Sequence, residues 1–162
     1  MIDQIIKQYS LKPHPEGGYY AETYRSKELI ASKSLPERFS GDRTFATAIY
    51  FLLVKDSFSA FHRIKSDECW HFYDGDALHV HVLHTDGSYE LICMGKNGLK
   101  GEVFQAVVPA GAWFASETTG AYSFVGCTVA PGFDFDDFEM AHFQTLQSQY
   151  PEQEKLIKRL CR

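Results

Sequence analysis

Short apolar segments alternate regularly with turn sequences, and this pattern constrains the fold more than any other feature of the chain. The segment TFATAIYFLLV at 44–54 is rich in β-branched and aromatic residues, and Asp74-Gly75 and Asn97-Gly98 are typical hairpin turns. Turn sequences that recur about every 8–12 residues favour an all-β sandwich or barrel. We therefore expect strands at 20–25, 44–54, 58–64, 68–73, 78–83, 89–94, 103–108, 112–116 and 121–130.

The two ends of the chain have a different pattern. Apolar residues at helical spacing predict a short amphipathic helix over 2–10, and the C-terminal part predicts helices over 137–149 and 151–161. Pro151 suits the first position of the last helix because that position needs no backbone N–H donor. We expect the C-terminal helices to pack on the outside of the barrel.

The chain has no internal repeat and no linker, so we expect one domain over 1–162. The barrel should span about 15–133 and the C-terminal helical segment about 137–161. The polar stretch 27–43 contains Pro36 and Gly41, which predicts a loop or a sheet edge. We expect this stretch to be the most mobile part of the chain.

Charge and hydropathy exclude several classes of protein. The net charge is −5 and no long run of Lys or Arg occurs, so we expect neither nucleic acid nor an anionic membrane as a partner. No apolar run is long enough for a membrane span, and the N-terminus lacks the pattern of a signal peptide. We expect a cytoplasmic protein. Its four widely spaced cysteines should be free thiols because no CxxC pair occurs.

Two motifs suggest where a pocket lies. His62, Glu68 and Gly75 have the spacing of the first motif of the cupin superfamily, and Pro109 and Gly111 match the turn of its second motif. The chain therefore resembles cupins, which implies a double-stranded β-helix, that is, a jelly-roll barrel. In most cupins three histidines and one glutamate converge inside the barrel and bind a transition metal.

This sequence departs from the cupin motifs at two of those four ligands. Ile64 and Phe114 stand where the resemblance implies histidines. We therefore expect no metal and no other cofactor in the barrel. A metal held by His62, Glu68 and an unexpected third ligand is the alternative. His71 has the opposite strand parity to Glu68, so it is a poor substitute ligand. His79 and His81 alternate with core positions, which predicts that they face solvent or a subunit interface.

A closer resemblance covers about residues 7–143. The segments PHPEGGYY and TVAPGFDFDDF look like the cupin subfamily described as a domain of unknown function, DUF985 or cupin 5. This resemblance implies a homodimer and supplies no reaction. The subfamily is similar in fold to the metal-independent sugar-nucleotide epimerases.

Candidate site residues follow from strand parity and side-chain chemistry. His62 suits proton transfer near neutral pH, and a buried Glu68 needs a partner, such as His62 or Arg25. The candidate catalytic residues are therefore His62, Glu68 and Tyr50, the last as a source of a hydroxyl group. The competing interpretation is that these side chains serve only core packing or a structural ion pair. Candidate ligand-binding residues are Glu16, Tyr19, Tyr24, Arg25, Trp70, His71, Gln105, Trp113, Phe114 and Phe133.

Two functions remain open at this point. The first is binding of a small organic molecule, such as a sugar, nucleotide or other metabolite, in the barrel pocket without chemistry. The second is a metal-independent sugar or nucleotide-sugar epimerase or isomerase, in which His62 abstracts a proton beside a carbonyl and a tyrosine protonates the other face.

Overall fold

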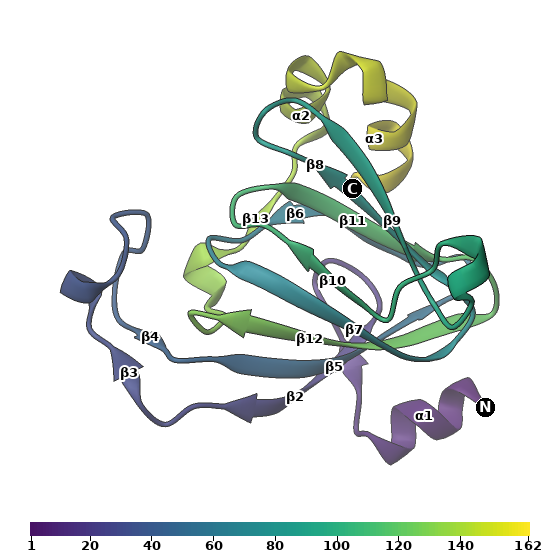
Figure 1. The fold of residues 1–162 in the computed structure, drawn as a ribbon, viewed down its shortest axis with the longest axis horizontal. Coiled ribbons are helices and arrows are strands. Elements are labelled where there is room, and N and C mark those ends of the chain that lie inside the picture. The colour runs from purple at the N-terminus through teal and green to yellow at the C-terminus, as the bar shows by residue number, and fades with distance from the viewer.

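Short antiparallel strands form most of the molecule, and helices lie at both ends of the chain (Figure 1). The structure is a computed structural model that describes residues 1–162. The helices are α1 (Ile2–Gln8), α2 (Phe143–Gln149) and α3 (Glu154–Leu160). The strands are β1 (Lys12–Pro13), β2 (Tyr19–Arg25), β3 (Leu29–Ile30), β4 (Arg43–Thr44), β5 (Thr47–Val54), β6 (Phe58–Arg63), β7 (Asp67–Gly75), β8 (Leu78–Leu83), β9 (Tyr89–Met94), β10 (Gln105–Val108), β11 (Trp113–Thr118), β12 (Tyr122–Ala130) and β13 (Glu139–Met140).

Two antiparallel sheets enclose the main core. The larger sheet has the strand order β1-β2-β5-β12-β7-β10, and the smaller sheet has the order β13-β6-β11-β8-β9. Strands β3 and β4 form a separate pair that extends to one side in Figure 1. Apart from the consecutive pairs β1-β2 and β8-β9, neighbours in each sheet are far apart in sequence, as in a jelly roll. The predicted all-β barrel is confirmed, and the predicted strands lie close to their expected positions.

The core follows the alternation of side chains along each strand. On β8, Leu78, Val80 and Val82 are fully buried between the sheets, whereas His79 and His81 point to the other face. On β7, Trp70 and Phe72 join the same core. Parity along a strand therefore decides which polar groups can reach the interior of the barrel.

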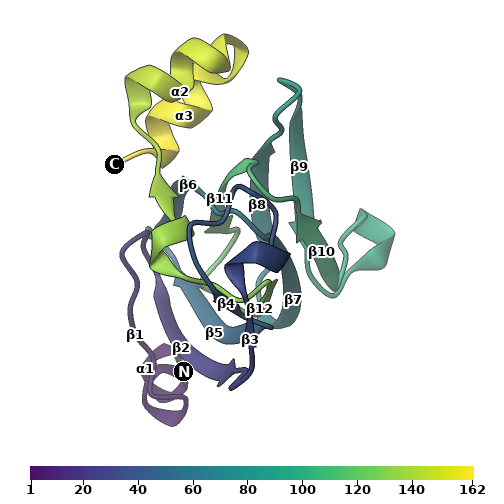
Figure 2. The same ribbon diagram turned by 90° about the vertical axis from the view of Figure 1, so that its left-hand side faces the viewer.

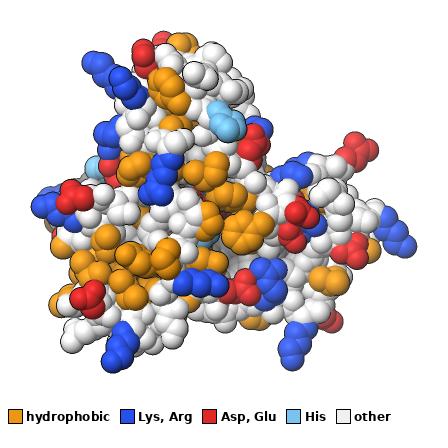
Figure 3. Space-filling view, turned by 180° about the vertical axis from the view of Figure 1, so that it is seen from behind, with side chains coloured by type: hydrophobic (Ala, Val, Ile, Leu, Met, Phe, Trp, Pro, Cys, Tyr) orange, Lys and Arg blue, Asp and Glu red, His pale blue; other side chains and the backbone are white.

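Helix α1 covers part of the outer face of the larger sheet. Its Ile2, Ile5 and Ile6 pack against a cluster that includes Leu52 and Phe124. The face seen from behind carries hydrophobic side chains at its lower left, over α1 and the neighbouring strands (Figure 3). The short helix is stabilised by this packing, because an isolated helix of its length is marginal in water.

Helices α2 and α3 pack on the outer face of the smaller sheet, at the end of the molecule opposite α1 (Figure 2). Leu146, Ile157 and Leu160 are buried against Phe61 and Trp113. The expected packing of these helices outside the barrel is confirmed. None of the helices is both long and apolar enough to cross a membrane.

The predicted helix over 137–149 is too long by six residues at its start, because α2 begins at Phe143. The preceding residues have other partners: Glu139 and Met140 pair with β6. Before them, the Asp134 side chain accepts a hydrogen bond from the Asp136 N–H and caps a single 3-10 turn.

The polar stretch 27–43 is more structured than the sequence predicts. Residues of β3 pair with β4, and the side chain of Arg43 is 4% exposed. Its guanidinium group donates two hydrogen bonds of 2.8 Å to the carboxylate of Asp137, which is 3% exposed. This buried ion pair ties the stretch to the segment that follows β12, next to the mouth of the barrel.

Candidate functional site

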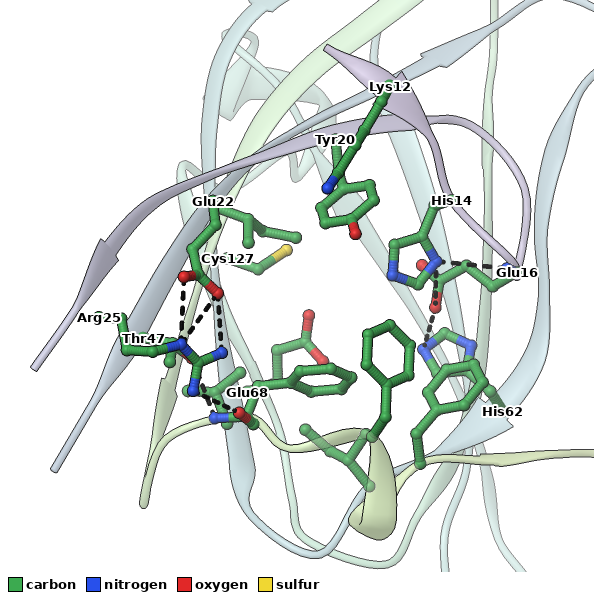
Figure 4. Close-up of a pocket in the computed structure, with 16 residues that line it drawn as sticks. Lys12, His14, Glu16, Tyr20, Glu22, Arg25, Thr47, His62, Glu68 and Cys127 are labelled. Carbon is green, nitrogen blue, oxygen red and sulfur yellow. Dashed lines mark hydrogen bonds and ion pairs between the residues drawn. The ribbon is translucent and has the colours of Figure 1, made fainter. Parts of the chain in front are cut away.

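A cavity of about 200 Å³ opens at the mouth of the barrel, between β1, β2, β5, β6, β7, β12 and the segment after β12 (Figure 4). Its lining combines carboxylates, histidines and phenylalanines, and the phenylalanine rings lie next to the histidine rings. The lining residues are Lys12, His14, Glu16, Tyr20, Glu22, Arg25, Thr47, Ile49, His62, Ile64, Glu68, Cys127, Val129, Phe133, Phe135 and Phe138.

A buried ion pair between His62 and Glu16 forms one wall of the cavity. His62 Nε2 lies 2.9 Å from Glu16 Oε2, and the two side chains are 3% and 9% exposed. His62 Nδ1 lies 2.7 Å from the Ala60 carbonyl oxygen, to which it donates. Since both ring nitrogens have acceptors, the geometry fits an imidazolium and a carboxylate. No such pair could be assigned from the sequence, in which Glu16 and His62 are far apart.

The pKa shifts of this pair agree with its geometry. Burial alone would raise the pKa of Glu16, but the charge of His62 and its hydrogen bond outweigh burial and lower that pKa. Burial alone would lower the pKa of His62, but the charge and hydrogen bond of Glu16, together with Glu68, raise it. Both shifts favour the charged pair near neutral pH.

His14 completes this wall as a neutral imidazole. The Glu16 backbone N–H donates to His14 Nδ1 at 3.2 Å, so the ring proton of neutral His14 lies on Nε2. Burial lowers the pKa of His14 and outweighs the nearby Glu16 carboxylate. The ring of His14 also packs edge-on against Tyr20, with centroids 4.6 Å apart.

Glu68 lies at the base of the cavity, and its carboxyl group points into the open space (Figure 4). Burial raises its pKa to about 7, and the negative charge of Glu16 adds to this shift while His62 opposes it. The predicted pairing of Glu68 with Arg25 is wrong, because Arg25 binds Glu22. Near neutral pH, Glu68 is therefore populated both as a carboxylic acid and as a carboxylate.

Arg25 reaches the rim of the cavity because β2 contains a bulge. The register against β5 shifts between Glu22 and Tyr24, so Arg25 is opposite the inward-facing Thr47. Arg25 Nη2 lies 2.7 Å from Glu22 Oε2, and its Nη1 donates to the Phe133 carbonyl oxygen at 3.1 Å. The bulge thus links β2 to the segment after β12.

Three phenylalanines from that segment form a phenylalanine wall of the cavity, next to the histidines. The ring centroids of Phe133 and Phe135 are 5.0 Å apart, and Phe138 lies 6.2 Å from Phe133 and 5.9 Å from Phe135. Phe138 also lies 5.3 Å from the His62 ring. A ligand in the cavity would meet both aromatic rings and carboxyl groups.

The metal-binding site that the cupin resemblance implies does not fit these residues. Ile64 lines the cavity at one of the implied ligand positions, and Phe114 packs against the His62 ring at 4.1 Å at another. Both nitrogens of His62 are already used by Ala60 and Glu16. His62 would lose the Glu16 contact if it bound a metal, and Glu68 alone is a weak site.

The structure places five predicted site residues at the cavity and the others elsewhere. His62, Glu68, Glu16, Arg25 and Phe133 line it. Phe114 lies just behind His62, and Trp70 lies deeper in the core with 1% exposure. These two aromatic residues are core residues, as the competing interpretation held.

The remaining predicted site residues lie away from the cavity, because of strand parity or of a register shift. Tyr50 and Tyr19 face the α1 side of the larger sheet, and the β2 bulge turns Tyr24 outward. His71 faces outward and binds Gln105, its partner in register on β10. Trp113 lies under the C-terminal helices, with the Arg63 guanidinium 4.4 Å from the centre of its ring.

Several cavity residues were not predicted. His14 and Tyr20 flank the Glu16-Gly17-Gly18 turn, so the quoted segment PHPEGGYY contains the information that would have found them. Lys12, Glu22, Cys127, Phe135 and Phe138 had no distinguishing pattern in the sequence.

Comparisons with known proteins agree with this fold. The model of the family described as "Cupin superfamily (DUF985)" matches residues 3–141. An uncharacterized protein of Saccharomyces cerevisiae, YML079W, is 32% identical over 147 residues, which is 84% of this chain and 73% of that protein. Neither comparison assigns a reaction.

Solved structures extend the comparison. A hypothetical protein from Leishmania major has a TM-score of 0.89 and 36% identity over 98% of this chain and 97% of that chain. A protein from Shewanella oneidensis has a TM-score of 0.89 and 35% identity over 99% and 96%. Oxalate decarboxylase from Bacillus subtilis, at 13% identity, has a TM-score of 0.56 over 91% of this chain and 36% of that chain, a likeness of fold alone.

Proposed function

Because the chain belongs to the DUF985 family of the cupin superfamily, we propose that its barrel mouth binds a small organic molecule with a hydroxyl-bearing ring, of about monosaccharide size. The observation that carries this proposal is the position of Glu68. Its carboxyl group is buried, points into the cavity and has a pKa of about 7. The Cys127 thiol is a weak hydrogen-bond partner of this buried carboxyl group, and a ligand hydroxyl would supply a stronger one.

The size of the cavity supports a single ring. At about 30 Å³ for each water in the liquid, the cavity volume of about 200 Å³ corresponds to some seven waters. This volume is below the range of about 300–1,000 Å³ that is common for pockets of drug-sized ligands. A nucleotide sugar is larger than this cavity, so the proposal narrows the ligand to a monosaccharide or a compound of similar size.

The chemistry of the walls supports a neutral ligand. His14 Nε2–H is a donor, the Glu16 and Glu68 carboxyl groups are acceptors, and the phenylalanine wall can pack against the apolar face of a ring. A phosphate group would meet three carboxyl groups, those of Glu16, Glu22 and Glu68. Of the two cations at the cavity, Arg25 is already held by Glu22, and the Lys12 ammonium lies over the Tyr20 ring, 5.1 Å from its centre. These contacts disfavour a nucleotide.

A second function follows from the pKa of Glu68. A group that titrates near 7 is suited to general acid–base catalysis, so the site would also serve a metal-independent isomerase or epimerase. Glu68, rather than His62, would then take the proton from the carbon beside a carbonyl, leaving an enolate. Tyr20, whose hydroxyl group points into the cavity, would donate a proton to it. His62 would be a positioning residue, since both its nitrogens bind protein acceptors.

The experiment has two stages. The full chain is first screened by thermal shift against neutral monosaccharides, keto sugars and nucleotide sugars, and we expect stabilisation by a single-ring compound. That compound is then incubated with the protein in deuterated water. Catalysis is supported if the wild type and the control Tyr50→Phe incorporate deuterium at a carbon of the compound and Glu68→Gln does not.

Stabilisation without deuterium incorporation supports binding alone. A nucleotide sugar that stabilises the protein more than the corresponding free sugar would contradict the argument from cavity size. Stabilisation that is equal in wild type and Glu68→Gln would contradict the placement of the ligand.

A further inference from the structure

A second cluster of polar side chains lies outside the barrel, on the outer face of the smaller sheet. His79 and His81 alternate with buried residues on β8, and Glu117 lies on the neighbouring strand β11, directly opposite His79 in register. Of the chain's His, Cys, Asp and Glu side chains, these three form the one group whose ligand atoms all lie within 4.8 Å of one another. The group is separate from the cavity, which opens from the inner faces of the sheets.

The chemistry of the group suits a transition metal. Two imidazoles and a carboxylate are the ligand set of open zinc sites, in which a water occupies the fourth position. Ligand atoms about 2.0–2.2 Å from a tetrahedral zinc ion lie roughly 3.3–3.5 Å from each other. His81 Nε2 and Glu117 Oε1 are 3.0 Å apart, so these two atoms need to separate by only a few tenths of an ångström.

Neighbouring side chains hold the two ligands in orientation. The Tyr89 hydroxyl group lies 2.9 Å from His81 Nδ1, on the other side of the ring from Glu117. A hydroxyl group can donate or accept, so Tyr89 can accept the Nδ1 proton when Nε2 gives its lone pair to a metal. Arg159 of α3 binds the other carboxylate oxygen of Glu117, Oε2, which leaves Oε1 as the ligand atom.

The site is pre-formed and accessible. The side chain of His81 is 6% exposed and that of Glu117 is 23% exposed, so both are held by their surroundings, while His79 is half-buried. Glu117 also lines a surface groove with Arg159 and residues 55–58 and 118–121, so its side chain is open to solvent on that side of the cluster.

We propose that His79, His81 and Glu117 form a Zn²⁺ site on the outer face of the smaller sheet, with a water completing the coordination. Zinc is favoured over calcium and magnesium because two of the three ligands are imidazoles. This site is distinct from the barrel position at which most cupins bind a metal, where this chain has Ile64 and Phe114.

Titration calorimetry of the full chain with Zn²⁺, after removal of metals with a chelator, tests the proposal. We expect one Zn²⁺ per chain. His79→Ala and Glu117→Gln should each weaken binding more than about tenfold, because loss of a group that merely supports a ligand already costs about 10–100-fold. Tyr89→Phe should weaken binding less than either. Co²⁺ in place of Zn²⁺ should give the visible absorption of a tetrahedral site, and His79→Ala should abolish it.

Two controls make the test specific. His84→Ala removes a half-buried histidine whose partner is Glu90, and His62→Ala removes the cavity histidine. Both should bind one Zn²⁺ as the wild type does. Circular dichroism checks that each variant is folded, and if Glu117→Gln unfolds because Arg159 loses its partner, then His79→Ala decides the test. Absence of stoichiometric binding, binding unchanged in His79→Ala, or binding lost only in His62→Ala would overturn the proposal.

Discussion

His62 Nε2 and Glu16 Oε2 lie 2.9 Å apart inside the barrel mouth, although Glu16 is in the turn between β1 and β2 and His62 is on β6, far away in sequence. This contact holds one wall of the cavity and places a second carboxyl group, that of Glu68, in an electrostatic field set by both partners. The predictions below follow from this arrangement and from the segments that support it.

Replacing Glu16 should change the ionisation of His62. In Glu16→Gln the imidazole loses the carboxylate charge that raises its pKa, so burial should dominate and the pKa of His62 should fall. NMR titration of the histidine ring protons measures this change. The ring-proton signals of His84, a half-buried histidine paired with Glu90, serve as the internal reference. An unchanged His62 titration would contradict the ion pair.

The free energy of unfolding should fall as the pH rises through the titration of Glu68. Because its pKa is raised from 4.5 to about 7, the native state binds more protons than the unfolded chain between these values. A shift of this size corresponds to a loss on the order of 3 kcal/mol. Glu68→Gln should remove most of this loss, as measured by chemical denaturation from about pH 4.5 to 8.

Glu37→Gln is the control for this titration, since Glu37 is exposed and should leave the pH profile unchanged. His62, whose pKa is also raised, should contribute a loss of stability with rising pH in both the wild type and Glu68→Gln, because its stabilising charge disappears above its folded pKa. A profile for Glu68→Gln identical to that of the wild type would show that Glu68 is an ordinary exposed carboxylate.

Gly17 should tolerate no side chain. Its φ of +114° is in a region that favours glycine, and a Cβ there would lie 2.0 Å from the Phe58 carbonyl oxygen. Gly87 has a φ of +91° with no atom within 4 Å of such a Cβ. Gly87→Ala should therefore cost only the conformational strain, about 1–2 kcal/mol, and Gly17→Ala should cost more. Thermal denaturation compares them, and equal losses would rule out the close approach that positions Glu16.

The buried pair of Arg43 and Asp137 should stabilise the segment that carries the phenylalanine wall. Asp137→Asn leaves the Arg43 charge without a partner, and we expect a loss of about 3–5 kcal/mol. Glu139→Gln, two residues away, breaks an exposed pair with Arg63 and should cost less than about 1 kcal/mol. Urea denaturation of both variants measures the difference, and similar losses would contradict the structural role of Asp137.

Strand alternation and turn chemistry made the barrel predictable. The predicted strands lie close to the observed ones because both signals are local in the sequence. The same alternation placed His62, Ile64 and Glu68 at the cavity, since they follow a simple inward parity. The predicted helix begins before the observed start of α2. Some of its predicted residues form β13 instead and pair with β6, a long-range contact that no local pattern reveals.

The cavity itself was harder to predict because it depends on register. Without the bulge after Glu22, Tyr24 would face inward and Arg25 outward, the reverse of what the structure has. Tyr50 has the wrong parity on a strand that is buried on both faces, where apolar residues give no sign of which face is the interior. Glu16 pairs with His62 because the turn that carries Glu16 lies close to β6 at the barrel mouth.

The most direct test of the account is titration calorimetry of the best single-ring ligand from the thermal-shift screen against four proteins. These are the wild type, Glu68→Gln, Phe133→Ala and the control Tyr50→Phe, whose substitution lies on the α1 side of the sheet. We predict one binding site per chain, affinity at least tenfold weaker in Glu68→Gln and in Phe133→Ala, and no change in Tyr50→Phe. Equal affinity in all four proteins would contradict the central claim that the ligand occupies the barrel mouth between Glu68 and the phenylalanine wall.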